Sequence, residues 1–168
     1  KYSNNHSHNL WKNLDILSIT QPEIIKTMHE EFLSSGVDII TTNTFNSNYI
    51  SQSKFGTEDI IIELNQESAR LAREISDKFT SENSEKPIFV AGSMGPTFIN
   101  LSLKSTYKFE DLKHAYLQQI EGLVLGECHI ILLETIVDTL TAKAGLEAYE
   151  EFFNRNKLPK LPLFISDC

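Results

Sequence analysis

Residues 37–46 read Val-Asp-Ile-Ile-Thr-Thr-Asn-Thr-Phe-Asn, and this stretch changes from apolar to polar within a few positions. Ile39 and Ile40 are β-branched and apolar, as expected for a strand that is buried on both faces. Hydroxyl and amide side chains follow at the point where that strand should end. Parallel α/β proteins bind their ligands at the carboxyl ends of such strands, so the stretch predicts a strand and one edge of a site.

The same change from apolar to polar occurs twice more along the chain. Residues 88–91 read Ile-Phe-Val-Ala and lead into Gly-Ser-Met-Gly-Pro at 92–96. Residues 130–133 read Ile-Ile-Leu-Leu and lead into Glu134 and Thr135. Segments with helical spacing of apolar residues separate the strands, and this alternation is typical of a parallel sheet with crossover helices. The pattern fits either a (β/α)8 barrel or an open, doubly wound sheet.

Local signals set the expected boundaries. Strands are expected at residues 37–43, 88–92, 129–134 and 163–166. Thr20 and Glu23 form a capping-box pattern with a proline in the first turn, which predicts that a helix starts there. The polar run 80–86 predicts a loop, and Asp138 is expected to cap a helix over about 139–153.

Composition excludes several classes of protein. The chain has 168 residues, of which 40% are apolar, so one domain or part of a larger one is expected. The net charge of -8 argues against nucleic acid as a partner, because no basic stripe could neutralise phosphates. The longest apolar runs are strand-sized and no signal peptide is evident, so no membrane span is expected. Two cysteines, Cys128 and Cys168, favour a reducing, cytoplasmic setting, with Cys128 as a core residue.

Five stretches carry a family resemblance: Leu-Ser-Ile-Thr-Gln-Pro-Glu-Ile-Ile at 17–25, Asp-Ile-Ile-Thr-Thr-Asn-Thr-Phe-Asn at 38–46, Phe-Gly-Thr-Glu-Asp at 55–59, Val-Ala-Gly-Ser-Met-Gly-Pro-Thr at 90–97 and Leu-Glu-Thr-Ile-Val-Asp-Thr-Leu at 133–140. Together they resemble the homocysteine-binding domain of cobalamin-dependent methionine synthase, in the homocysteine S-methyltransferase family. The resemblance covers about Leu14 to Ser166, and the order of the motifs makes it specific.

The resemblance implies a (β/α)8 TIM barrel, of which this chain would cover about helix 1 to strand 5. The first strand and the C-terminal half of the barrel would be missing. Residues 1–13 would be a polar lead-in, and residues 14–168 a partial homocysteine-binding barrel domain. The first residue is Lys rather than Met, and the four expected strands alone cannot close a barrel, so a fragment is expected.

The implied reaction transfers a methyl group from methylcobalamin, recharged by 5-methyltetrahydrofolate, to the zinc-bound thiolate of homocysteine, and it gives methionine. The zinc cysteines of the family would lie outside this chain, so neither a metal ligand nor a catalytic residue is assigned here, and Cys168 receives no role. Homocysteine would be the substrate. The cobalamin and folate domains of the same full-length chain would be the partners, and the isolated fragment is expected to be inactive.

Glu134 is the first candidate for substrate binding, because a carboxylate that follows four apolar residues should lie at a strand tip. There it could accept charge-assisted hydrogen bonds from the α-ammonium of an amino-acid substrate. The family resemblance points to the same role. The alternative is that Glu134 caps the helix that follows.

Five further residues complete the predicted substrate site. Asn43 and Thr44 could bond the substrate, hold the glutamate in position, or only stabilise a loop. Gly92, Ser93 and Met94 are expected to form a turn whose N–H groups could meet a carboxylate. The alternative for these three is a turn without any ligand.

Two other functions stay open at this stage. A stand-alone homocysteine S-methyltransferase that uses betaine or S-methylmethionine would share the barrel and the zinc chemistry. Residues 42–46 and 55–59 look more like the methionine synthase pattern. A truncated, non-catalytic fragment is the alternative from a different class, because half a barrel exposes two sheet edges and an uncovered core.

Overall fold

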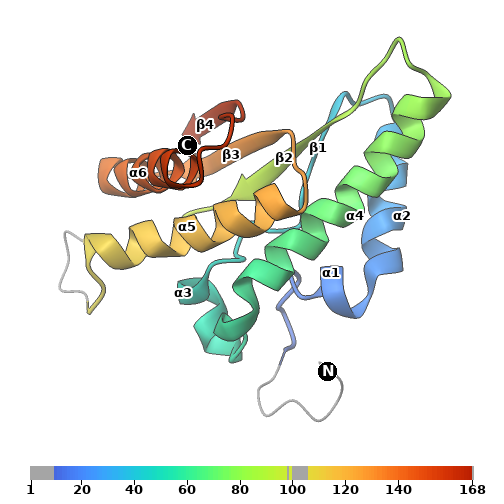
Figure 1. The fold of residues 1–168 in the computed structure, drawn as a ribbon. Coiled ribbons are helices and arrows are strands. Elements are labelled where there is room, and N and C mark those ends of the chain that lie inside the picture. Colours follow the sequence, from blue (N-terminus) through green and yellow to red (C-terminus); the bar gives the residue numbers. More distant parts are fainter. Residues whose placement is uncertain (1–9, 98, 100–105, 168) are drawn as a thin grey trace.

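The computed structural model describes residues 10–97, 99 and 106–167 of the chain. Most of the predicted lead-in and Cys168 lie outside the described residues. The described part is built on a four-stranded, all-parallel sheet with the strand order β1-β2-β3-β4 (Figure 1). The strands are β1 (Ile39–Thr41), β2 (Phe89–Met94), β3 (Ile130–Ile136) and β4 (Leu163–Asp167).

Helices connect and cover these strands. They are α1 (Leu17–Thr20), α2 (Pro22–Ser34), α3 (Tyr49–Gln52), α4 (Ile61–Glu82), α5 (Phe109–Leu125) and α6 (Thr139–Asn156), with 3-10 turns at Ser53–Phe55 and Glu58–Ile60. Helices α2, α4, α5 and α6 pack against one another in chain order and form one layer over the sheet (Figure 1). Among the described residues, no helix has both the length and the apolar character needed to cross a membrane.

The strand order distinguishes the two predicted topologies. In a doubly wound sheet the strand order reverses at one point, whereas here each strand pairs with the one before it in sequence. Crossovers between parallel strands are right-handed, so an order without reversal places all crossover helices on the same face. This is the arrangement of a (β/α)8 barrel, and it confirms the predicted partial barrel.

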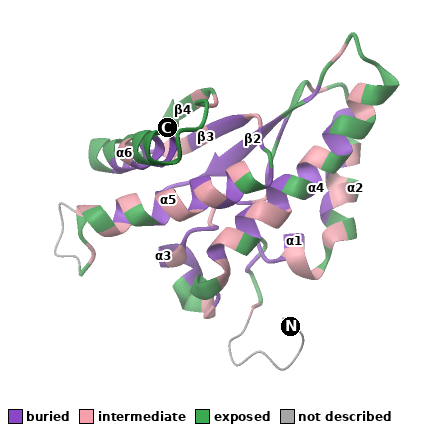
Figure 2. Cartoon of the chain, in the orientation of Figure 1, coloured by how far each residue is buried: buried purple, intermediate pink, exposed green. Residues whose placement is uncertain are grey.

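The two faces of the sheet differ in burial. Met94 and Leu133 face the helices and are fully buried. Much of β2 and β3 is buried, as the purple colour in Figure 2 shows. The opposite face, here called the inner face, carries Ile39 and Phe89, which pair in the β1–β2 register and are 43% and 40% exposed. Ile40 is buried as predicted, but the prediction that β1 is buried on both faces is wrong for Ile39.

The predicted helix start at Thr20 is wrong. Residues Leu17–Thr20 already form α1, and the Thr20 hydroxyl donates to the carbonyl of Ile16 at 3.1 Å. Thr20 therefore cannot adopt the extended backbone of a capping residue. Helix α2 begins at Pro22, whose fixed φ angle suits a first turn.

Two other boundaries differ from the prediction. The strand expected at 37–43 covers only Ile39–Thr41, because the chain leaves the sheet once its polar residues begin. The loop expected from residue 80 starts only after Glu82, where α4 ends. The last turn of α4 is polar in composition but is still helical, because a turn that faces solvent needs no apolar side chain.

Candidate functional site

The carboxyl ends of β1 and β2 are joined by three buried residues with hydroxyl groups, Thr42, Thr44 and Ser93. The Thr42 and Thr44 hydroxyl oxygens lie 2.6 Å apart. The Ser93 N–H donates to the Thr42 hydroxyl at 3.0 Å, and the Thr44 hydroxyl donates to the Ser93 carbonyl at 2.6 Å. The exposed fractions of the three residues are 4%, 0% and 2%. They are called the hydroxyl ring below.

The hydroxyl ring reaches Glu134 through the side chain of Ser93. The Ser93 hydroxyl donates to the Glu134 carboxylate and links β2 to the carboxyl end of β3. Ser93 pairs with Leu132, and Glu134 lies two residues further along β3, so both side chains lie on the inner face. Glu134 is only partly buried, which leaves its carboxylate within reach of a ligand.

The alternative role of Glu134 as a helix cap is wrong, because Asp138 caps α6. The Asp138 carboxylate accepts the Thr141 N–H at 2.8 Å and the Thr141 hydroxyl at 2.6 Å. This is the capping role that the sequence predicts for Asp138. The two carboxylates, four residues apart, therefore have separate tasks, and only Glu134 is directed to the inner face.

A β-bulge directly follows the candidate carboxylate on β3. Leu133 pairs with Ile165. Ile136, three residues later, pairs with Asp167, which is only two residues further along β4. Thr135 absorbs the additional residue with a φ of 59°, in the left-handed region that β-branched residues rarely adopt. The residue directly after Glu134 therefore has a strained backbone. Beyond the bulge, Ile136 again lies on the buried face of the sheet.

Asn43 points away from the carboxylate and braces the loop after β1. Its side-chain amide donates to the carbonyl of Leu14 at 2.9 Å and to the Ser18 hydroxyl at 3.4 Å. Its N–H donates to the Ser68 hydroxyl on α4 at 2.9 Å. Of the three roles predicted for Asn43, this geometry supports the stabilisation of a loop.

The turn predicted at Gly92, Ser93 and Met94 is wrong, because these residues form the end of β2. Met94 is fully buried on the helix side. A Cβ atom on Gly92 would lie 2.9 Å from a methyl carbon of Leu123, so this glycine lets α5 pack closely against the strand. The strand ends at Met94, and Gly95 is the first residue beyond it.

Sequence reasoning missed a buried polar layer beneath the loop after β1. The Asp15 carboxylate accepts the Asn46 N–H at 2.9 Å and the Ser47 hydroxyl at 2.7 Å, and burial raises the pKa of this carboxyl. The Gln119 side chain on α5 donates to the carbonyl of Thr44 at 3.1 Å. These partners lie 31, 32 and 75 residues apart in sequence, so no local pattern could have revealed them.

The described residues include no cluster that fits a zinc site. Over the part of the chain that the structure describes, no group of three His, Cys, Asp or Glu side chains could hold a metal ion. Cys128 is 4% exposed, and burial raises the pKa of its thiol to about 12. A neutral, enclosed thiol does not act as the thiolate ligand that zinc requires. Cys128 is the core residue that the sequence predicts.

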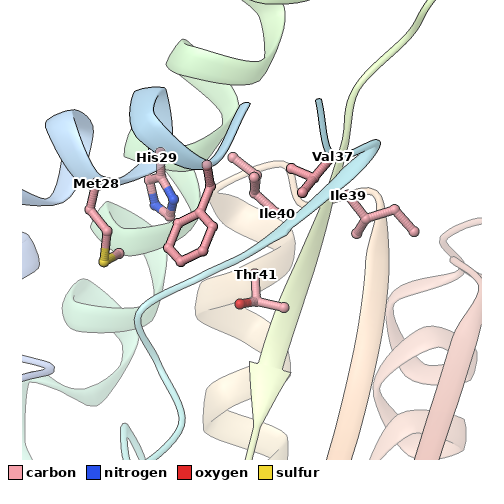
Figure 3. A pocket seen from close by; sticks show the side chains of 7 residues that line it. Met28, His29, Val37, Ile39, Ile40 and Thr41 are labelled. Carbon is pink, nitrogen blue, oxygen red and sulfur yellow. The ribbon is translucent and has the colours of Figure 1, made fainter. Parts of the chain in front are cut away.

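Two hollows flank the sheet. One of about 530 Å³ lies at the carboxyl ends of β3 and β4, where it is lined in part by Ile136, Asp138, Ile165 and Asp167. The other, of about 230 Å³, lies between α2 and β1 and is lined in part by Met28, His29, Phe32 and Ile39 (Figure 3). The described lining of the first hollow does not include Glu134, and the second hollow lies along the edge of the sheet.

The fold and the site together define the class of this protein as part of a (β/α)8 barrel with a polar site at the carboxyl ends of its strands. The chain belongs to the homocysteine S-methyltransferase family, whose family model matches residues 1–168. This confirms the family that the five motifs indicate.

Solved structures of the homocysteine methyltransferase MmuM from Escherichia coli share the fold. The metallated form matches with a TM-score of 0.71 at 20% sequence identity, over 89% of this chain and 53% of that protein. The oxidized form matches with a TM-score of 0.72 at 21% identity, over 94% of this chain and 54% of that protein. The chain therefore spans about half the length of these proteins, as expected for a fragment.

Proposed function

We propose that the full-length protein transfers a methyl group to the sulfur of homocysteine, which gives methionine, and that this chain binds the amino-acid part of the substrate. Membership of the homocysteine S-methyltransferase family supports the reaction. The observation that carries the role of this chain is the position of Glu134. Its carboxylate lies on the inner face at the carboxyl end of β3, where barrel enzymes bind their ligands.

In this proposal Glu134 accepts hydrogen bonds from the α-ammonium of homocysteine. Such charge-assisted bonds are roughly twice as strong as bonds between neutral groups, and they require the carboxylate to be held in place. Ser93 and Thr44 hold it, and Asn43 braces the loop that carries Thr44. Gly92 and Met94 contribute through packing of β2 against the helices.

In this proposal the zinc ligands lie on strands outside this chain, as the resemblance to the family implies. The role of this chain is therefore confined to binding and orientation. Fixing the amino-acid end of homocysteine limits the positions open to its thiol, and such orientation is itself a source of rate enhancement. We place the reaction in the cytoplasm, which the low cysteine count favours.

We propose methylcobalamin, recharged by 5-methyltetrahydrofolate, as the methyl donor, with cobalamin and folate domains elsewhere in the full-length chain. The support is the sequence of residues 42–46 and 55–59, which looks more like the methionine synthase pattern. The second candidate is a stand-alone enzyme that uses betaine or S-methylmethionine, since it would share the homocysteine site. A truncated, non-catalytic fragment is the third candidate and is tested through the isolated chain below.

The test compares wild type with Glu134→Gln in the full-length protein. Two thiols serve as acceptors: L-homocysteine and 4-mercaptobutanoate, which is homocysteine without its amino group. Methylcobalamin, betaine and S-methylmethionine are offered separately as donors. Loss of a hydrogen bond between charged groups costs about 1.5–3 kcal/mol, so KM for homocysteine should rise at least about tenfold in the variant. KM for 4-mercaptobutanoate should stay unchanged.

Glu147→Gln is the matched control, because Glu147 lies on the outer surface of α6, where it pairs with Lys143 at 3.7 Å. Its kinetics should equal those of the wild type. An unchanged KM for homocysteine in Glu134→Gln would contradict the proposed role of this carboxylate in substrate binding. The donor that supports turnover in the wild type distinguishes methionine synthase from the stand-alone enzymes.

A further inference from the structure

The direction of each hydrogen bond in the hydroxyl ring follows from counting protons. A carbonyl oxygen only accepts, so the single hydroxyl proton of Thr44 is directed to the carbonyl of Ser93. In its contact with Thr42, Thr44 therefore accepts, and Thr42 donates. The Thr42 oxygen in turn accepts the N–H of Ser93.

The ring thus starts at the N–H of Ser93, passes through both threonine hydroxyls, and ends at the carbonyl of the same Ser93. Both main-chain groups of this one residue are held by side chains from the loop after β1. Bonds in a closed chain of donors polarise one another, and burial of all three residues strengthens each bond. Ser93 is consequently held through both its N–H and its carbonyl.

The ring leaves the side chain of Ser93 free for a separate task. An ionised carboxylate has no proton to donate, so the Ser93 hydroxyl must donate to Glu134. The position of the Glu134 carboxylate is thereby tied, through one hydroxyl, to a main chain that the ring holds on both sides. Thr135, directly after Glu134, adopts a strained backbone conformation. The backbone around Glu134 is therefore not in a relaxed conformation that would by itself fix the position of this residue.

We infer that Thr42, Thr44 and Ser93 are positioning residues, which hold Glu134 so that it receives the ammonium of an α-amino-acid substrate. The inference rests on the proposed function. It explains why Thr44 is fully buried although it lies at the strand tip where the substrate is expected. Thr44 acts on the substrate through Ser93 and Glu134, and it makes no contact of its own.

A purely structural role of the ring predicts a different outcome. If the ring only ties β1 to β2, its loss lowers stability and affects all substrates alike. If it positions Glu134, its loss weakens recognition of the ammonium group and leaves a substrate without that group unaffected. The comparison of two thiols therefore separates the two roles.

The experiment uses the full-length protein with the substitutions Thr44→Val, Thr44→Ser and Ser93→Ala. Valine has the shape of threonine but breaks the ring, serine restores the hydroxyl, and alanine at position 93 removes only the bond to Glu134. Thr57→Val is the matched control, because Thr57 is equally buried and its hydroxyl bonds Gln52 at 2.6 Å. KM and kcat are measured with L-homocysteine and with 4-mercaptobutanoate.

In Thr44→Val and Ser93→Ala, KM for homocysteine should rise about tenfold, with kcat within about twofold. KM for 4-mercaptobutanoate should stay at the wild-type value, and Thr44→Ser should recover most of the lost affinity. Ser93→Ala leaves the ring intact, so it reports on the positioning of Glu134 even if Thr44→Val fails to fold.

The control variant and the wild type show whether the positioning role or the proposed function is wrong. Equal changes for both thiols in Ser93→Ala, or kinetics like those of Thr57→Val, would overturn the positioning role. A wild type that does not distinguish the two thiols would instead overturn the proposed function, because no ammonium contact would then exist to be positioned.

Discussion

Acidification should destabilise the folded protein through one buried imidazole, that of His29. His29 lies on α2, is 2% exposed, and lines the hollow beside β1 together with Met28 and Phe32 (Figure 3). Among the described residues, its Nε2 atom has no hydrogen-bond partner. Burial without a partner disfavours the charged form and lowers the pKa of His29 from 6.5 to about 4.

The sign and the size of the effect follow from these two pKa values. The unfolded chain protonates His29 below pH 6.5, whereas the folded chain resists protonation until about pH 4. The stabilisation is therefore fully present above pH 6.5 and is lost as the pH falls toward 4. At about 1.36 kcal/mol for each pKa unit, the difference amounts to roughly 3 kcal/mol.

Urea unfolding of wild type and His29→Leu at a series of pH values between about 7.5 and 4 measures this contribution. The free energy of unfolding of the wild type should fall more steeply than that of the variant, by about 3 kcal/mol over the range. His114→Gln, which removes an exposed imidazole from α5, is measured alongside as the control. Parallel pH dependence of wild type and His29→Leu would refute the argument.

Three further predictions test local features. Asp138→Ala should lower the free energy of unfolding by about 1 kcal/mol in urea, because α6 loses its cap, while Asp138→Asn should stay close to wild type. Thr135→Gly should raise that free energy by up to about 1 kcal/mol, since glycine tolerates a φ of 59°, whereas Thr135→Ala keeps the Cβ atom and should gain nothing. The isolated 168-residue chain should transfer no methyl group, and it should self-associate in sedimentation velocity because Ile39, Phe89 and Phe164 are exposed on the inner face. The substitution Phe89→Glu should reduce this association. An active monomer would contradict the prediction.

The sequence predicts those features that depend on neighbouring residues. Alternation of apolar segments identified each of the four strands of the described sheet, and Asp138 was recognised as a cap because its partner is only three residues away. The position of Glu134 near the carboxyl end of β3 was predicted in the same way, since four apolar residues directly precede it, and its role in substrate binding stays a prediction. Local spacing left the strand order open, and only the pairing in the structure distinguishes the barrel from the doubly wound sheet.

The errors have both local and non-local causes. Gly92 was interpreted as part of a turn, but it serves close packing with Leu123, which is 31 residues away on α5 (123 minus 92). The capping box at Thr20 failed because a preceding helical turn, α1, already determines the backbone there. The partner of Asp15 at Ser47 is 32 residues distant, and the partner of Thr44 at Ser93 is 49 residues distant. No periodicity encodes such pairs.

The hydroxyl ring also accounts for the mismatch in length between β1 and β2. The ladder between the two strands ends with the bond from the Thr42 N–H to the Ala91 carbonyl, at 3.0 Å, although β2 continues to Met94. Beyond that point the main-chain groups of Ser93 that face β1 would lose their partners, and an unpaired buried N–H or carbonyl is costly. Continuing β1 as a strand would satisfy them, but it would also extend the sheet across the proposed substrate site. The threonine hydroxyls satisfy the same groups while the main chain of β1 turns away, so the end of the sheet stays open beside a firmly held Ser93.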